Sequence, residues 1–100
     1  MSRIEDLEAF LAIVEQGSLT AAAKRLGRPL QTVSRSLAML EADVGVELVH
    51  RTTRRSMPSE AGESFYLRIK PAVEQIHEAR EEVAQRRSEP SGVLRLGAPS

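Results

Sequence analysis

Apolar residues recur at steps of three and four along most of the chain, which is the spacing of one face of a helix. The pattern predicts a first helix over about residues 4–16 and a third over about residues 30–44. Between them, Ser18 offers an N-cap and Gly27 a stop for a short second helix. Ser2 is the expected N-cap of the first helix. Three helices joined by tight turns predict a small trihelical unit.

Residues 48–58 have a different pattern. Leu48, Val49 and the threonine pair that follows favour extended structure, and basic residues lie among them. We expect two short strands around a tip at Thr53 and Arg54. Such a basic hairpin after three helices would form a wing.

A long helix is predicted after Ser59, its expected N-cap, and should extend to about residue 87. Its apolar positions form a seam typical of coiled coils. They are Phe65, Tyr66, Ile69, Val73, Ile76 and Val83. We expect a second copy of the chain to cover this seam, because no other predicted helix is large enough. Pro71 predicts a bend near residues 67–71.

The last residues read as a linker followed by a strand. Residues 88–92 have linker composition, and residues 93–97 alternate in the manner of a strand. A strand at the end of a chain has nothing to pair with, so we expect the opening of a further domain. A frayed tail is the alternative.

Composition limits the possible chemistry. The chain has 100 residues, of which 41% are hydrophobic and 28% charged, with three aromatics and no cysteine. These values predict one globular domain with an aliphatic core, and they exclude disulfides and cysteine-based zinc sites. No apolar run is long enough for a membrane span and no signal-peptide core is present, so we expect a cytoplasmic protein.

Charge is distributed unevenly, although 14 basic and 14 acidic side chains balance overall. Residues 24–55 carry seven basic and three acidic side chains, whereas residues 1–23 carry one and four. A local basic stripe, more than the net charge, is the expected mark of a nucleic-acid-binding surface.

The spacing of Ala23, Gly27 and Val33 predicts a helix-turn-helix over about residues 19–38. The motif needs a small residue where its helices cross, a turn residue that tolerates positive φ, and a branched apolar anchor under the second helix. The second helix could then place its N-terminal half in a major groove.

We expect the DNA-binding residues to combine base readout with phosphate contact. Glutamine suits adenine, arginine suits guanine, and threonine or leucine can contact a thymine methyl group. A helix start and a basic wing suit phosphates. The candidates are Ser18, Thr20, Arg28, Leu30, Gln31, Thr32, Ser34, Arg35, Arg51, Arg54 and Arg55. Two alternatives stay open: Lys24 and Arg25 could form a solvated face, and Arg51 could make a structural bond at the base of the wing.

Other functional classes find less support. The sequence has no glycine-rich phosphate loop, no nucleophile and base at useful spacing, and no metal-binding cluster, so neither an enzyme nor a cofactor is expected. His50 and His77 are isolated and are interpreted as solvated. A dimerisation module over residues 60–87 is expected in addition to DNA binding.

Several motifs together resemble the LysR-type transcriptional regulators. They are Ser18 to Leu26, Thr32 to Arg35, Leu40-Glu41, Gly45, Leu48, Arg51 to Arg54, and Ser59 to Gly62. The resemblance covers nearly the whole chain and is most specific in its first sixty residues. The chain also departs from the family pattern: Leu30 replaces the usual glutamine, and Gln31 stands where proline is common. Val49 replaces an aromatic residue, Pro58 a leucine and Ser59 a threonine.

The resemblance implies a mainly α protein with a winged helix-turn-helix over residues 1–59 and a linker helix over residues 60–87. It implies that the helix dimerises with its antiparallel mate, and it leaves open a tetramer in a longer protein. Residues 88–100 would be a hinge and the first strand of an effector-binding domain. It therefore implies a bacterial regulator that binds promoter DNA as a homodimer and a small-molecule effector only through that domain.

Overall fold

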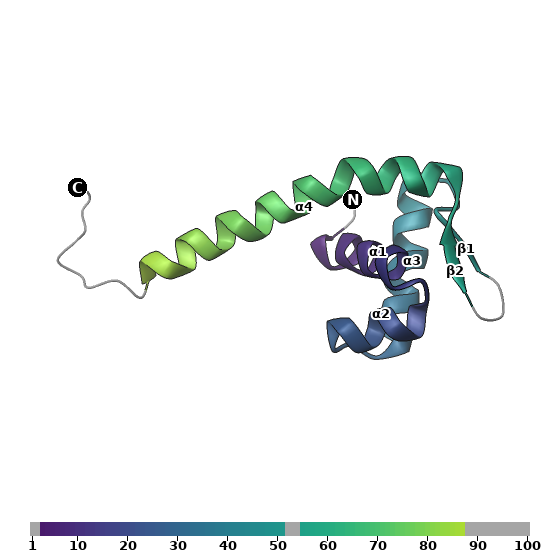
Figure 1. Cartoon of the computed structure of the whole chain (residues 1–100), viewed down its shortest axis with the longest axis horizontal. Helices are drawn as coiled ribbons and strands as arrows, with labels where there is room; N and C mark the ends of the chain where they lie inside the picture. Colours follow the sequence, from purple (N-terminus) through teal and green to yellow (C-terminus); the bar gives the residue numbers. More distant parts are fainter. Residues whose placement is uncertain (1–2, 52–54, 88–100) are drawn as a thin grey trace.

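The computed structural model describes residues 3–51 and 55–87, and this part of the chain is mainly helical. Its elements are α1 (Ile4–Gln16), α2 (Leu19–Leu26), α3 (Leu30–Val44), β1 (Val49–Arg51), β2 (Ser56–Pro58) and α4 (Glu60–Arg87). Figure 1 shows α1, α2 and α3 packed into one body, with the hairpin at its side and α4 extending well beyond it. The predicted fold, three short helices, a wing and a long helix, is confirmed.

Local signals fix the helix ends. Ser18 caps α2, because its Oγ accepts the Ala21 N–H at 3.0 Å. Gly27 ends the same helix with φ of 67°, a left-handed conformation that glycine adopts without steric cost. The start of α1 differs from the prediction. Arg3, and not Ser2, occupies the N-cap position, and the Asp6 carboxylate accepts the Arg3 N–H at 3.4 Å.

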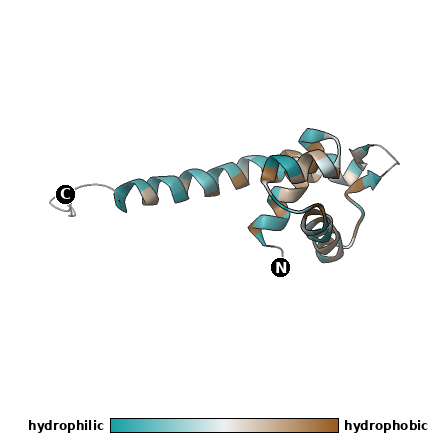
Figure 2. Cartoon of the chain, turned by 90° about the horizontal axis from the view of Figure 1, so that it is seen from below, coloured by the Kyte–Doolittle hydropathy of each residue, from teal (hydrophilic) through white to brown (hydrophobic). Residues whose placement is uncertain are grey.

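The core is aliphatic around one aromatic pair. Its largest fully buried side chains come from α1, α3 and the segment that enters β1: Phe10, Ile13, Val33, Leu37, Leu40, Leu48 and Val49. Phe10 of α1 meets Phe65 of α4, with ring centroids 5.6 Å apart. Figure 2 shows brown, hydrophobic residues gathered in the body, while α4 beyond it is largely teal and hydrophilic.

The wing is a two-stranded antiparallel hairpin whose pairing runs from Val49 opposite Pro58 to Arg51 opposite Ser56. It is tied to the body by backbone hydrogen bonding, since the Ser56 N–H donates to the Gly17 carbonyl at 2.9 Å. The predicted tip at Thr53 and Arg54 lies outside the described residues.

The start of α4 is fastened to the residues before β1. Ser59 caps the helix by accepting the Gly62 N–H at 3.0 Å, and its hydroxyl donates to the Glu47 carbonyl at 2.7 Å. Gly62 is buried so closely that a Cβ there would lie 2.0 Å from the Leu48 carbonyl oxygen. The predicted Ser59 cap is confirmed, and this contact explains why a glycine follows it.

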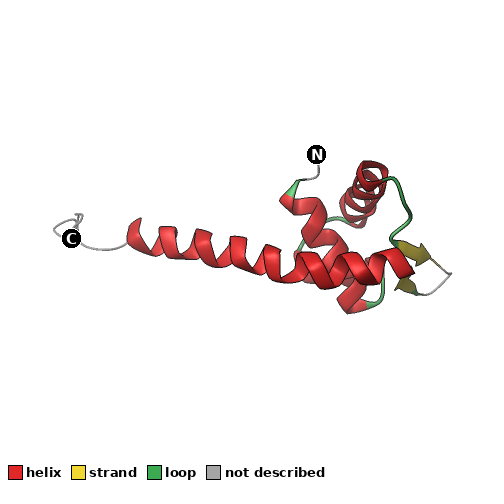
Figure 3. Ribbon diagram, turned by 90° about the horizontal axis from the view of Figure 1, so that it is seen from above, coloured by secondary structure: helices red, strands yellow, loops and turns green. Residues whose placement is uncertain are grey.

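Pro71 does not interrupt α4, which Figure 3 shows as one continuous helix to residue 87. The predicted bend is present only as a gentle curve, visible in Figure 1. None of the helices in residues 3–51 and 55–87 is long and apolar enough to cross a membrane.

The predicted seam of α4 is divided between two environments. Phe65, Tyr66, Ile69 and Val73 pack on the core of their own chain, so the expectation that no helix of this chain covers the seam is wrong for its first half. Ile76 and Val83 do not pack on that core and are 41% and 66% exposed. The predicted hinge and strand in residues 88–100 fall outside the described residues.

Candidate nucleic-acid interface

The N-terminal half of α3 presents a polar face to solvent. Pro29 is its N-cap, and Leu30, Gln31, Thr32 and Arg35 are all exposed. On the opposite side, Val33 and Leu37 are completely buried against the other helices. This buried anchor fixes which face of the helix points outward, and helical spacing places Gln31, Thr32 and Arg35 together on it. Leu30 is exposed in the first turn but lies on the side of Leu37. Ser34 is half-buried at the edge of that face.

At the start of α2, the two predicted residues Ser18 and Thr20 differ in how far their side chains are exposed. The Ser18 hydroxyl is already engaged as the cap of the helix, and its residue is half-buried. Thr20, in contrast, is exposed in the first turn. Of the two predicted residues, Thr20 is therefore the one whose side chain is presented to a ligand.

Arg28 points toward α1 and away from the exposed face of α3. Its Nη2 lies 2.8 Å from Glu8 Oε1, and its Nη1 donates to the Glu5 carbonyl at 3.2 Å. Only 24% of its side chain is exposed. The structure thus gives this predicted DNA-binding residue a bracing role between α1 and the turn after α2.

The wing carries exposed basic residues on either side of residues 52–54. Arg51 ends β1 and Arg55 precedes β2, and both are exposed, whereas Arg54 lies outside the described residues. His50, predicted to be solvated, is exposed and lies 3.2 Å through its Nδ1 from Glu47 Oε1.

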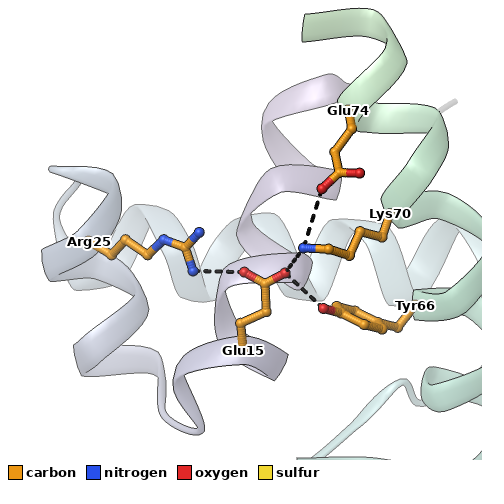
Figure 4. Close-up of polar contacts among 5 residues, drawn as sticks. All are labelled: Glu15, Arg25, Tyr66, Lys70 and Glu74. Atoms are coloured by element: carbon orange, nitrogen blue, oxygen red, sulfur yellow. Dashed lines mark hydrogen bonds and ion pairs between the residues drawn. The ribbon is translucent and has the colours of Figure 1, made fainter. Parts of the chain in front are cut away.

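A hydrogen-bonded cluster around Glu15 was not predicted from the sequence. Its carboxylate accepts from Arg25 Nη1 at 2.7 Å, from Tyr66 Oη at 2.8 Å, and from Lys70 Nζ (Figure 4). Burial raises the pKa of Glu15, but the bonds from Lys70, Tyr66 and Arg25 outweigh it and lower the pKa to about 2. The bond to Glu15 also raises the pKa of Lys70. Arg25 is therefore not simply a solvated residue.

A second carboxylate on α1, that of Glu8, also contacts basic residues from two other segments. Glu8 holds Arg28, as described above, and its Oε2 lies 2.8 Å from His77 Nε2 on α4. His77 is exposed to solvent, as predicted, but it is not isolated, because Glu8 lies against its ring. The one signal in the sequence is spacing: Glu8 and Glu15 are seven residues apart, as are Lys70 and His77.

Comparison with known proteins shows which family has this sequence and architecture. Residues 4–63 match the family model described as "Bacterial regulatory helix-turn-helix protein, lysR family". An HTH-type transcriptional regulator of Xanthomonas campestris pv. campestris is 42% identical over 96% of this chain and 28% of its own length. The HTH-type transcriptional activator AaeR of Escherichia coli K12 is 31% identical over the whole chain and 32% of its own length.

Solved structures agree with these relatives. The CbnR DNA-binding domain, crystallised in complex with DNA, matches 86% of this chain and 94% of its own, with a TM-score of 0.67 and 31% identity. The BenM DNA-binding domain on catB site 1 DNA matches 88% of this chain and 99% of its own, with a TM-score of 0.77 and 25% identity.

The chain belongs to the LysR family of bacterial regulatory helix-turn-helix proteins. It spans about 28% to 32% of the length of the two curated relatives described above. These relatives carry the names of transcriptional regulators and not of enzymes.

Proposed function

We propose that this chain binds duplex DNA in a sequence-specific manner and acts in transcription regulation, as a homodimer. The observation that carries the proposal is the exposed N-terminal half of α3, anchored from below by the buried Val33 and Leu37. A helix held in this way can enter a major groove with its polar face toward the bases. The similar CbnR and BenM domains were solved as complexes with DNA, which supports DNA binding by this chain.

Within the groove, each exposed residue of α3 has a chemical task. Arg35 can donate two hydrogen bonds to guanine, and Gln31 can pair with the edge of adenine. Leu30 and Thr32 can contact a thymine methyl group, and Ser34 can bond to a nearby base or phosphate. Because Leu30 takes the place of the usual glutamine, the preferred bases should differ from those of relatives that have it.

Phosphate contacts would surround this reading surface. Thr20 is exposed at the start of α2, and Arg51 and Arg55 are exposed on the wing; Arg54, which lies outside the described residues, is a further candidate. Hydroxyl groups and cations that contact phosphates fix the register of a recognition helix on the duplex without reading sequence. Arg28 and Ser18, which are engaged within the protein, would contribute mainly by shaping this surface.

The exposed second half of α4 would join two copies. Ile76 and Val83 are one heptad apart, so they lie on one stripe that a second helix can cover. The predicted contribution of Phe65, Tyr66, Ile69 and Val73 would then be indirect, because they hold the helix on its own body. An effector would act through a separate domain, and the setting would be the bacterial cytoplasm. No catalytic role is proposed.

Titration of a promoter fragment at several salt concentrations tests this function. A dimer that neutralises six to ten phosphates should lose about 10³- to 10⁵-fold in affinity between 50 and 200 mM salt. Failure to bind at low salt, or binding without this steep dependence, would contradict the proposal.

Two substitutions separate base readout from anchoring. Arg35→Ala should relax base preference at one position and cost about 1–3 kcal/mol on the preferred site. Arg54→Ala should weaken binding to all sequences by a similar factor and reduce the salt dependence. Equal losses of base preference in both variants would show that the assignment of these two roles is wrong.

A further inference from the structure

Two carboxylates of α1 connect the helix-turn-helix to α4 in a repeating arrangement, which we call the carboxylate ladder. In the first rung Glu8 joins Arg28 to His77, and in the second rung Glu15 joins Arg25 to Lys70. Seven residues separate the rungs on both α1 and α4, which is about two helical turns or 10.5 Å. Because the spacing is equal, both pairs can form together in only one alignment of α1 with α4.

Each rung has one partner on either side of α1. Arg25 belongs to α2 and Arg28 to the turn that follows it, whereas Lys70 and His77 belong to α4. Both carboxylate side chains are only 19% exposed, and they accept hydrogen bonds of 2.7 Å from Arg25 and 2.8 Å from Arg28, while His77 Nε2 lies 2.8 Å from Glu8 Oε2. Hydrogen bonds of this length between a guanidinium and a carboxylate are strong and directional. The position of α2 is in this way linked to the position of α4.

Apolar packing alone would not fix this position. Contacts such as that of Phe10 with Phe65 are non-directional, and Val73 is the last buried apolar residue of α4 among those described. A groove of about 280 Å³, lined by Leu11, Leu26 and Val73 among others, separates the elements that the ladder joins. The rungs cross a region that side chains do not fill, so they can set the angle between α4 and the body.

We propose that the carboxylate ladder positions the helix-turn-helix on α4 and thereby selects the spacing between the two half-sites that a dimer binds. The inference rests on the proposed function, since it assumes two copies joined through the second half of α4. The separation of their α3 helices then depends on how each body is held on its own α4. One base pair of spacing moves a half-site by about 3.4 Å and rotates it by about 35°. A loosened attachment would tolerate such a change.

The experiment uses a library of duplexes in which two randomised inverted arms flank a spacer. The unsubstituted chain selects the arm sequence, which is then fixed while the spacer is varied by single base pairs. We expect the unsubstituted chain to lose about tenfold in affinity for each base pair away from its optimum. The variant Glu8→Gln with Glu15→Gln should vary about threefold or less over the same spacers, with an unchanged arm preference.

Two further variants make the result specific. Lys70→Gln with His77→Gln removes the basic α4 partners of both carboxylates, leaves Arg25, Arg28 and the bond from Tyr66 to Glu15 in place, and should broaden the spacing in the same direction. Glu78→Gln, an exposed carboxylate on the same helix, removes one negative charge outside the ladder and should keep the sharp optimum. The second pair also tests the proposal if the α1 variant does not fold.

The outcomes separate this inference from the function on which it rests. Broader spacing with unchanged arms supports it, because simple destabilisation would weaken all spacers equally. A sharp and unchanged optimum in the folded ladder variants, or equal weakening at every spacer, would overturn the inference alone. If the unsubstituted chain enriched no duplex, the proposed function and the inference would both fall.

Discussion

The two halves of α4 share one apolar period but have opposite surroundings. In residues 60–73, Gly62 and Val73 are buried and the apolar side lies on the body of the chain. In residues 74–87 every residue is exposed, including Ile76 and Val83. One continuous row of apolar residues can thus pack on its own chain in its first half and remain available to a second partner in its second half. The body made by the other helices ends beside residue 77. Its length therefore determines how far along α4 the chain's own core covers the seam.

The same charge placed in each half gives the largest expected contrast. Val73→Asp would bury an unpaired carboxylate at a position only 3% exposed, and should lower the free energy of unfolding by about 3–5 kcal/mol. Val83→Asp should change it by less than about 0.5 kcal/mol. Urea titration followed by circular dichroism, at a concentration where the chain is monomeric, measures both. Similar losses would show that the two halves do not differ.

Adding a methyl group at Gly62 tests how closely the first half of α4 packs against the rest of the chain. The Cβ of Gly62→Ala would lie 2.0 Å from the Leu48 carbonyl oxygen, and backbone cannot yield as a flexible side chain does. We expect a loss of about 2–3 kcal/mol in the free energy of unfolding, measured by urea titration. Ser64→Ala, at an exposed position of the same turn, is the matched control and should have little effect. Unchanged stability in Gly62→Ala would contradict the close contact.

The second half should respond in assembly and not in folding. Ile76→Glu places a charge on the exposed stripe, so we expect monomers by light scattering and DNA affinity lower by about tenfold or more. Gln75→Glu adds the same charge at a neighbouring exposed residue and should leave the dimer intact. If Ile76→Glu still formed dimers, the proposed seam would be wrong.

The sequence predicted the elements well because local chemistry determines them. Ser18 and Ser59 cap their helices, and Gly27 takes the left-handed conformation, as their residue types indicate. The bounds of the third helix and the location of the hairpin also follow from local pattern. The cap of α1 was predicted one residue too early, because Arg3 is the N-cap and its N–H donates to the Asp6 carboxylate three residues further on.

Contacts between distant segments could not be predicted in the same way. Periodicity shows that Phe65 and Ile76 face one side of a helix, but it does not say what covers either. The pairing of Arg28 with Glu8 joins residues 20 positions apart, and that of Lys70 with Glu15 joins residues 55 apart. Such pairs depend on how α1 crosses α2 and α4. For this reason the sequence did not reveal that Arg28 and His77 both contact Glu8.

Acid should weaken the attachment of the first half through Glu15. The folded protein holds the pKa of Glu15 at about 2, below its ordinary value of 4.5, so folding favours the charged carboxylate. The resulting stabilisation is present above about pH 4.5 and is lost as the pH falls toward 2. We expect Glu15 to account for about 1–3 kcal/mol of this loss, with the low end reflecting partial exposure to solvent.

Comparison of two variants isolates this contribution. Glu15→Gln should be less stable than the unsubstituted chain at pH 6, and the difference should shrink toward pH 2, where the carboxyl is neutral in the unfolded chain and about half neutral in the folded protein. Glu78→Gln should follow the unsubstituted curve throughout. The free energy of unfolding from urea titrations between pH 2 and 6 measures the three curves. If Glu15→Gln kept the full acid dependence, other carboxylates would be responsible, and the bonds from Arg25, Tyr66 and Lys70 would not hold α4 to the body as strongly as their geometry indicates.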